Sequence, residues 1–305
     1  MQAKPVSLTR RHLYFAALLI LWAAVFRQAL GTVVGSSLSD ENYGHILLVW
    51  PVSAFLLYSA GKNIFAKVEY NPVAGLALLL PMAAFAYISG HVSSLSESGY
   101  ISLSILCFVS CSLLAFVLCY GMAAFRAAAF PLLFLLLTVP VPEAVLQPVI
   151  SVLQDRSGDV TCFLYQVAHV PYVRHGIVIS LANLDIQIVQ ECSGIRSTMV
   201  LVLASLVLAH LYLKSWLSKA LLVLSVIPLT IAKNGLRIFT LSTLGTYWDS
   251  SFLTGRLHHQ GGFVFFALAF GALLLLIWIL QKAEADRTPA RAPSTPVPAV
   301  LKEGV

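Results

Sequence analysis

GGFVFFALAFGALLLLIWILQ, residues 261–281, is a run of 21 residues without a charged side chain. A helix needs about 20 predominantly apolar residues to cross the hydrocarbon core of a bilayer. Apolar runs of this kind recur along the chain. The predicted spans are residues 12–30, 45–61, 72–89, 101–120, 125–141, 194–213, 216–234 and 261–281. The pattern predicts an all-α polytopic membrane protein with about eight transmembrane helices.

The composition excludes an ordinary soluble protein. Of the 305 residues, 59% are hydrophobic and only 10% are charged, whereas soluble domains carry about 25% charged residues. The net charge of +6 does not indicate nucleic-acid binding, because the basic residues occur singly or in pairs between apolar runs. The five cysteines form no paired framework that would predict a disulfide-stapled fold. We expect no nucleic acid partner, no metal and no cofactor.

The distribution of Lys and Arg predicts the orientation. If the amino terminus is cytoplasmic, twelve of the 19 Lys and Arg residues lie on the inner side and seven on the outer side, as the positive-inside rule requires. Both termini are therefore predicted to be cytoplasmic. Arg10 and Arg11 precede the first apolar run, which has no clear small-x-small cleavage site and is expected to remain as an uncleaved span.

Two segments differ from the membrane-spanning pattern. Residues 283–305 are rich in Ala, Pro and charged residues, which predicts a disordered cytoplasmic tail after a membrane domain at 1–282.

Residues 143–192 carry too many charged residues to cross the hydrocarbon core without a large free-energy cost. Val145–Val167 has apolar residues at helical spacing, which predicts an interfacial amphipathic helix. Alternation of Ile and Leu over Tyr172–Ile188 predicts a short β-hairpin, so residues 143–192 should form a small extracytoplasmic cap.

Cys192 is the last residue of this cap, directly before the predicted start of the sixth span. A helix amino terminus and nearby cations lower the pKa of a thiol and favour the nucleophilic thiolate. The alternative is that Cys192 is a small apolar residue, and local context leaves both interpretations open. For Cys107, Cys111 and Cys119, which lack polar neighbours in the fourth span, apolar packing is favoured.

Arg237 and His258 lie at the outer ends of the next two spans in the predicted orientation. A guanidinium can stabilise a thiolate or a developing oxyanion, although an arginine at this depth can also simply extend to the interface. Histidine can accept a proton from a thiol and return it to a leaving amine, although interfacial histidines also serve as polar anchors. Thiol, base and oxyanion stabiliser are together the groups that acyl transfer needs.

Two alternatives to an acyl-transfer enzyme remain. The first is a non-enzymatic membrane subunit of an exopolysaccharide export system, for which charged residues should line a pathway through the spans. The second is a thiol redox enzyme in which Cys162 pairs with Cys192. The chain contains no Cys-x-x-Cys sequence.

Between about Asp40 and Leu280 the chain resembles the exosortase/archaeosortase family of multi-spanning, cysteine transpeptidase-like membrane enzymes. The resemblance rests on the order and spacing of short motifs. These are Cys-Ser-Gly-Ile-Arg at 192–196, Asn234-x-x-Arg237, His258-x-x-x-Gly262 followed by Phe265 and Phe266, and the weaker Asp40-x-x-Tyr43-Gly44-His45 and Pro140-Val141-Pro142.

The resemblance implies a catalytic set and a substrate class. It implies Cys192 as nucleophile, Arg237 as transition-state stabiliser and His258 as general acid/base, with His259 as the fallback base. A histidine, where archaeal relatives carry a second arginine, implies the bacterial branch and the inner membrane, with the active site on the periplasmic face. The implied partners are proteins that end in a PEP-CTERM-like sorting motif, a transmembrane helix and a basic tail, often in organisms that make exopolysaccharide, together with the membrane lipid.

Overall fold

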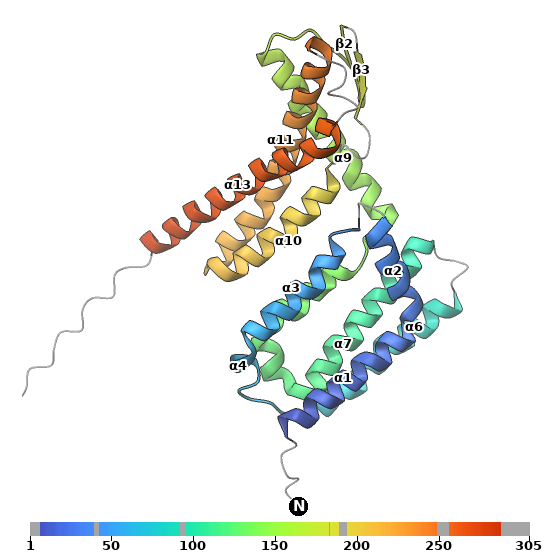
Figure 1. The fold of residues 1–305 in the computed structure, drawn as a ribbon. Helices are drawn as coiled ribbons and strands as arrows, with labels where there is room; N and C mark the ends of the chain where they lie inside the picture. The colour runs from blue at the N-terminus through green and yellow to red at the C-terminus, as the bar shows by residue number, and fades with distance from the viewer. Residues whose placement is uncertain are drawn as a thin grey trace, which may run out of the picture.

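The computed structural model describes residues 7–39, 43–91, 96–182, 184–188, 194–248 and 256–287, with side chains in the last segment described from Gly262 to Asp286. These residues are mostly helical, with one small sheet (Figure 1). The longer helices are α1 (Leu8–Val25), α2 (Arg27–Ser39), α3 (Ile46–Ser59), α6 (Leu79–Gly90), α7 (Glu97–Ala127), α9 (Glu143–Val167), α10 (Ile195–Tyr212), α11 (Trp216–Tyr247) and α13 (Arg256–Arg287). Shorter helices are α4 (Gly61–Ile64), α5 (Pro72–Ala77), α8 (Ala129–Phe134) and the 3-10 helix η2 (Leu135–Thr138).

Six spans in the described residues are long and apolar enough to cross a bilayer. The segment from α8 to η2 becomes a seventh if it is taken together with α9, and α3 is a shorter apolar helix. The α8–η2 segment ends at Thr138, before Pro140 and Pro142, because proline cannot continue the backbone hydrogen-bond ladder. The predicted class, an all-α polytopic membrane protein, is therefore confirmed.

The amino-terminal half packs around α7, whose middle is largely buried. This helix is interrupted at Gly121, which has φ +87°. A Cβ atom there would lie 2.7 Å from the carbonyl oxygen of Glu69, so only glycine fits. The backbone N–H of Glu69 donates to the carbonyl of Tyr120 (3.1 Å). The loop between α4 and α5 is therefore hydrogen-bonded to α7 beside its interruption.

In the carboxy-terminal half, α10, α11 and α13 share an apolar core, with Leu201, Leu222, Val226, Ala269, Leu273 and Ile277 buried.

Two helix boundaries differ from the sequence prediction. The helix α11 continues 13 residues beyond Asn234, where the span was predicted to end. The helix α13 runs to Arg287, five residues into the segment predicted to be disordered. Ala and Glu in that stretch favour helix, and Glu284 accepts hydrogen bonds from the backbone N–H groups of Lys214 and Ser215 (3.0 and 2.9 Å); residues 288–305 lie outside the described residues.

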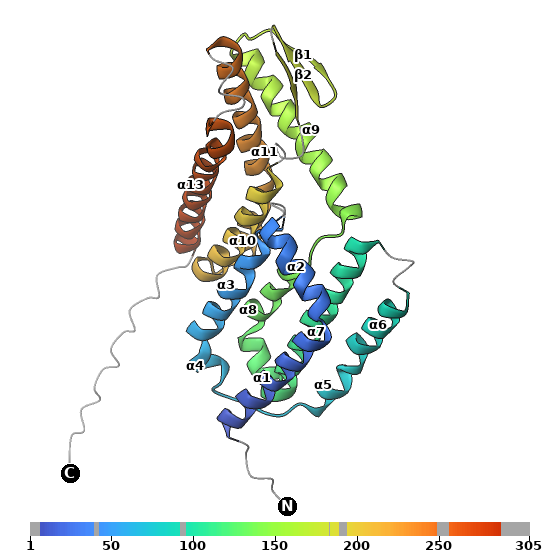
Figure 2. The same cartoon turned by 45° about the vertical axis from the view of Figure 1, so that its right-hand side comes forward.

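The predicted cap is present. The helix α9 makes an angle of 91° with the α8–η2 segment, and in Figure 1 it runs across the ends of α3 and α10 rather than along them. The strands β1 (Val173–His175), β2 (Val178–Leu181) and β3 (Leu184–Gln187) form an antiparallel sheet in that order. The β2–β3 pair is the predicted hairpin, and β1 adds a third strand. The cap lies opposite the start of α1 and the end of α13 (Figure 2); we call the ends of the helices nearest to it the cap end.

Candidate functional site

Of the four predicted site residues, the structure describes the side chain of Arg237, which lies in α11 and is partly buried. Cys192 falls in 189–193, outside the described residues. His258 and His259 belong to the first turn of α13, and their side chains lie outside the description. The site is therefore built from the residues that flank these positions.

The most informative flanking residue is Gly194, which precedes α10 and has left-handed backbone angles (φ 66°, ψ 22°). A Cβ atom on Gly194 would lie 2.8 Å from Cγ of Asn234 and closer still to its amide atoms. Glycine is required at this position both for its conformation and for the close approach. The Cys-Ser-Gly-Ile-Arg motif and the Asn-x-x-Arg motif, forty residues apart in sequence, are therefore in direct contact.

The other side of the 189–193 segment begins at Ile188, which is buried in the cap. Its N–H donates to the carbonyl of Ile177 (2.8 Å), and its carbonyl accepts from Nε2 of Gln154 on α9 (2.8 Å). The chain thus leaves the interface between α9 and the sheet and enters α10 beside Asn234. Both anchors are at the cap end.

The helices α9 and α11 cross closely at Gly235, the residue after Asn234. A Cβ atom there would lie 2.6 Å from Cβ of Val160. The hydroxyl of Thr161 is also close to the Gly235 carbonyl (3.2 Å). This crossing holds the turn of α11 that carries Arg237 against the cap.

Sequence reasoning assigned no role to a buried pair in the same region. Lys233, only 8% exposed, donates a hydrogen bond from Nζ to Oγ of Ser197 in the first turn of α10. The signal available in the sequence was a lysine within an apolar run, because a charged group in such a run needs a partner on another segment. The sequence does not identify that partner.

The cap carries a cluster of partly exposed ion pairs. Arg174 of β1 contacts Asp159 (2.6 Å) and Asp155 (2.7 Å) of α9, and Arg156 contacts Asp159 (3.1 Å). The hydrogen bond from Arg174 is the main reason that the pKa of Asp159 lies below its usual range. The two pairs made by Arg174 fasten the sheet to α9 and are exposed to solvent on the aspartate side.

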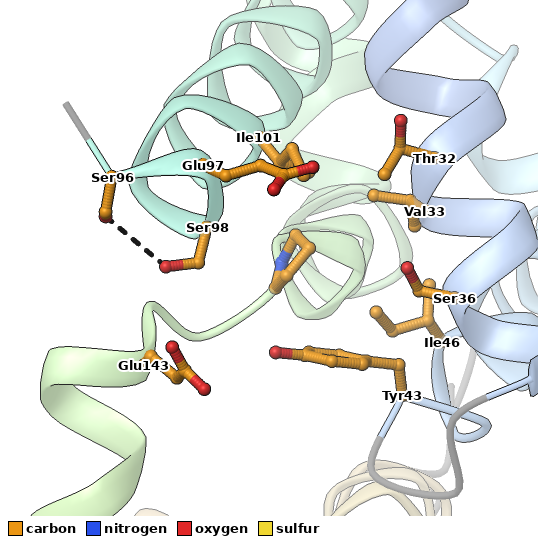
Figure 3. Close-up of a pocket in the computed structure, with 11 residues that line it drawn as sticks. Thr32, Val33, Ser36, Tyr43, Ile46, Ser96, Glu97, Ser98, Ile101 and Glu143 are labelled. Atoms are coloured by element: carbon orange, nitrogen blue, oxygen red, sulfur yellow. Dashed lines mark hydrogen bonds between the residues drawn. The ribbon is translucent and has the colours of Figure 1, made fainter. Parts of the chain in front are cut away.

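A cavity of about 350 Å³ lies at the cap end of the amino-terminal half (Figure 3). Tyr43 and Pro140, from the two weaker motifs, both line it, together with the carboxylates of Glu97 and Glu143. Val141, next to Pro140, packs against an apolar cluster that contains Ile195 of α10. The two weaker motifs therefore meet in one cavity near the start of α10.

The remaining cysteines are buried thiols. Cys107, Cys111 and Cys119 pack inside the amino-terminal core, which agrees with the apolar interpretation. Cys162, proposed above as a redox partner, is a free thiol in the apolar core of the cap. Within the described part of the chain, no group of three or more His, Cys, Asp or Glu residues could hold a metal ion.

Comparison with known protein families supports the motif assignment. Residues 35–275 match the transmembrane exosortase family (Exosortase_EpsH), which covers most of the chain. No curated protein and no solved structure matches. The matched region contains the cavity lining except Thr32 and Val33. It also contains the Gly194–Asn234 contact, the Lys233–Ser197 pair and the positions of Cys192, Arg237 and His258. The chain is a member of the transmembrane exosortase family.

Proposed function

We propose that this chain is a membrane-embedded cysteine peptidase or transpeptidase that cleaves carboxy-terminal sorting signals of exported proteins. Cys192 is the nucleophile, Arg237 stabilises the oxyanion and His258 is the general acid/base. The substrates are proteins that end in a PEP-CTERM-like motif, a transmembrane helix and a basic tail.

The observation that carries this proposal is the contact between Gly194 and Asn234. A chain segment of two residues spans at most about 7 Å between Cα atoms. The Cα atom of Cys192 is therefore within that distance of the Cα atom of Gly194. Asn234 and Arg237 are three residues apart and share one side of α11. The nucleophile and the stabilising cation are thus proposed to face one another at the cap end.

The proposed orientation places the cap end outside the cytoplasm, in the periplasm of a bacterial inner membrane. The opposite end carries Lys214, Lys219 and Lys282 around the α10–α11 turn and the end of α13, which fits the positive-inside rule. Lys233 lies 17 residues into α11, about 26 Å from its start at 1.5 Å per residue. A hydrocarbon core is about 30 Å thick, so Lys233 lies near its outer boundary and the rest of α11 extends beyond it.

The proposed reaction proceeds through a thioester. The transmembrane helix of the substrate packs beside the bundle and presents the sorting motif on the membrane side of α9. The Cys192 thiolate attacks the scissile carbonyl carbon, and Arg237 stabilises the negative oxygen. The C–N bond then breaks as protonated His258 gives its proton to the leaving amine. An acceptor amine or water then attacks the thioester, gives its proton to His258 and releases the thiolate.

Co-expression with a host protein that carries such a signal tests the proposal. Cleavage is measured by the mass of the substrate's new carboxy terminus, and membrane insertion by the yield of full-length enzyme. Cys192→Ala, Arg237→Gln and His258→Ala should each abolish cleavage. Cys107→Ala, His259→Ala and Arg10→Gln are the matched controls and should retain it. A correctly inserted Cys192→Ala protein that still cleaves the substrate would refute the assignment.

A further inference from the structure

Lys233 is a charged residue in the interior of a helix that crosses the membrane. Its side chain is 8% exposed, and a buried ammonium is costly unless it is paired and hydrogen-bonded. Nζ donates a hydrogen bond to the hydroxyl of Ser197 on α10. The pair thus joins the middle of α11 to the first turn of α10.

The hydroxyl of Ser197 continues this connection to the backbone. It donates to the carbonyl of Gly194 (2.9 Å), which also accepts from the hydroxyl and the N–H of Thr198 (2.8 and 2.9 Å). A serine hydroxyl has one donor and two acceptor positions, so it can accept from the lysine and donate to the carbonyl at once. Lys233, Ser197 and Gly194 therefore form one chain of hydrogen bonds.

This chain of bonds ends on the glycine that contacts Asn234. Gly194 is held from one side by the packing of Asn234 and from the other by Ser197. Lys233, Asn234 and Arg237 lie within one turn of α11, since residues three and four apart are neighbours on a helix surface. The ammonium of Lys233 and the guanidinium of Arg237 are thus two cations on the side of α11 that faces the start of α10.

We propose that Lys233 and Ser197 are positioning residues for Cys192: they hold the start of α10 against α11, and the Lys233 ammonium is a second cation that favours the thiolate. This inference rests on the proposed function.

Charged groups on the elements packed around the site also affect the thiol. They are Arg196 on α10, Arg237 on α11, Arg174 on β1, and Glu143, Asp155, Arg156 and Asp159 on α9. The acidic members Asp155 and Asp159 are paired with Arg174. The cations that this turn of α11 contributes are Lys233 and Arg237.

The pH dependence of Cys192 alkylation tests the charge effect. Full-length enzyme in lipid nanodiscs is treated with iodoacetamide from pH 5 to pH 10, and modification of the Cys192 peptide is followed by mass spectrometry. Lys233→Met should move the midpoint of alkylation upward by about one pH unit, since a neighbouring cation lowers a thiol pKa. Lys233→Arg keeps the charge and should restore the midpoint. Lys219→Met, at the opposite end of α11, is the matched control and should leave it unchanged.

Turnover of a sorting-signal substrate tests the positioning effect. Ser197→Ala should lower kcat about tenfold with little change in KM, because the ammonium remains but the start of α10 is less firmly held. An unchanged alkylation midpoint in folded Lys233→Met enzyme, or unchanged kcat in Ser197→Ala enzyme, overturns the inference and leaves the proposed function standing. Cleavage that survives Cys192→Ala but is lost in Ser197→Ala overturns both, because a Ser–Lys pair would then be the catalytic group.

Discussion

The two halves of the molecule each bury a cation beside an irregular stretch of backbone, but the partners of the two cations differ. In the amino-terminal half, Arg11 is 6% exposed, donates from Nη1 to the carbonyl of Cys119 (2.7 Å) and lies 4.1 Å over the ring of Tyr70. In the carboxy-terminal half, Lys233 contacts the hydroxyl of Ser197.

The difference between the two partners indicates which cation stabilises the fold and which one supports the candidate site. The partner of Arg11 is a carbonyl just before Gly121, where α7 is interrupted. A carbonyl cannot donate onward, so the interaction ends there and repairs a helix break. The partner of Lys233 does donate onward, through Ser197 to Gly194. Arg11 should therefore contribute to stability, whereas Lys233 should contribute to activity.

The largest expected effects come from the two glycines at these irregular positions. Gly194→Ala places a Cβ against Asn234 and forces an L residue into the left-handed region, so cleavage should fall at least 100-fold, or about 2.7 kcal/mol in activation free energy. Gly121→Ala meets the backbone of Glu69 and should lower the thermal stability while folded molecules keep their activity. Gly271→Ala, with open space around it, is the control. Equal loss of activity per folded molecule in both variants would erase the distinction between the halves.

The next effect concerns Arg11 itself. Arg11→Met should lower the free energy of unfolding by about 1–3 kcal/mol, because the carbonyl of Cys119 loses its buried donor. Thermal unfolding of the purified protein in nanodiscs measures the change, and cleavage per folded molecule should stay the same. Arg10→Met, at an exposed neighbouring position, is the matched control. Lost cleavage at full stability in Arg11→Met would mean that the amino-terminal cation also serves the site.

A smaller effect is expected where the cap joins the site half. The hydroxyls of Tyr165 on α9 and Ser242 on α11 are 2.5 Å apart and buried. Tyr165→Phe removes this hydrogen bond and should lower stability by about 1 kcal/mol, with a modest fall in cleavage because α9 and α11 hold the site together. Tyr172→Phe, which affects only an exposed bond to Gln166, should change stability by less than about 0.5 kcal/mol. Matching effects for the two tyrosines would show that the α9–α11 contact does not depend on the buried bond.

The smallest effect is the pH dependence of the cap. The pKa of Asp159 is lowered in the folded state by Arg174, so this pair contributes its stability above the ordinary Asp pKa of about 3.9 and loses it as the pH falls through the lower folded value. The protection of the sheet amides, which is their exchange rate corrected for the intrinsic effect of pH, should therefore fall below about pH 4, by a few-fold given the exposure of Asp159. Arg174→Met should exchange faster at neutral pH and lose this dependence. A wild-type cap whose protection does not respond to acid would show that the ion pairs do not fasten the sheet.

Much of the fold could be predicted from local sequence. Apolar runs such as residues 261–281 predict spans because lipid offers the backbone no hydrogen bonds and each helix must satisfy its own. Amphipathic spacing predicted α9, and alternation predicted the β2–β3 hairpin. These signals are properties of consecutive residues, so they need no knowledge of the neighbours in space. The motifs around Cys192, Arg237 and His258 likewise indicated the family from the sequence alone.

Tertiary structure decided what depends on contacts between distant segments. Hydropathy could not show that α11 continues past Asn234, because those residues are stabilised by packing on α9 at Gly235 rather than by lipid. It could not pair Lys233 with Ser197, 36 residues away, or bring Tyr43 and Pro140 into one cavity. Charged and polar side chains inside a membrane protein need specific partners, and only the folded chain determines which side chain supplies each one.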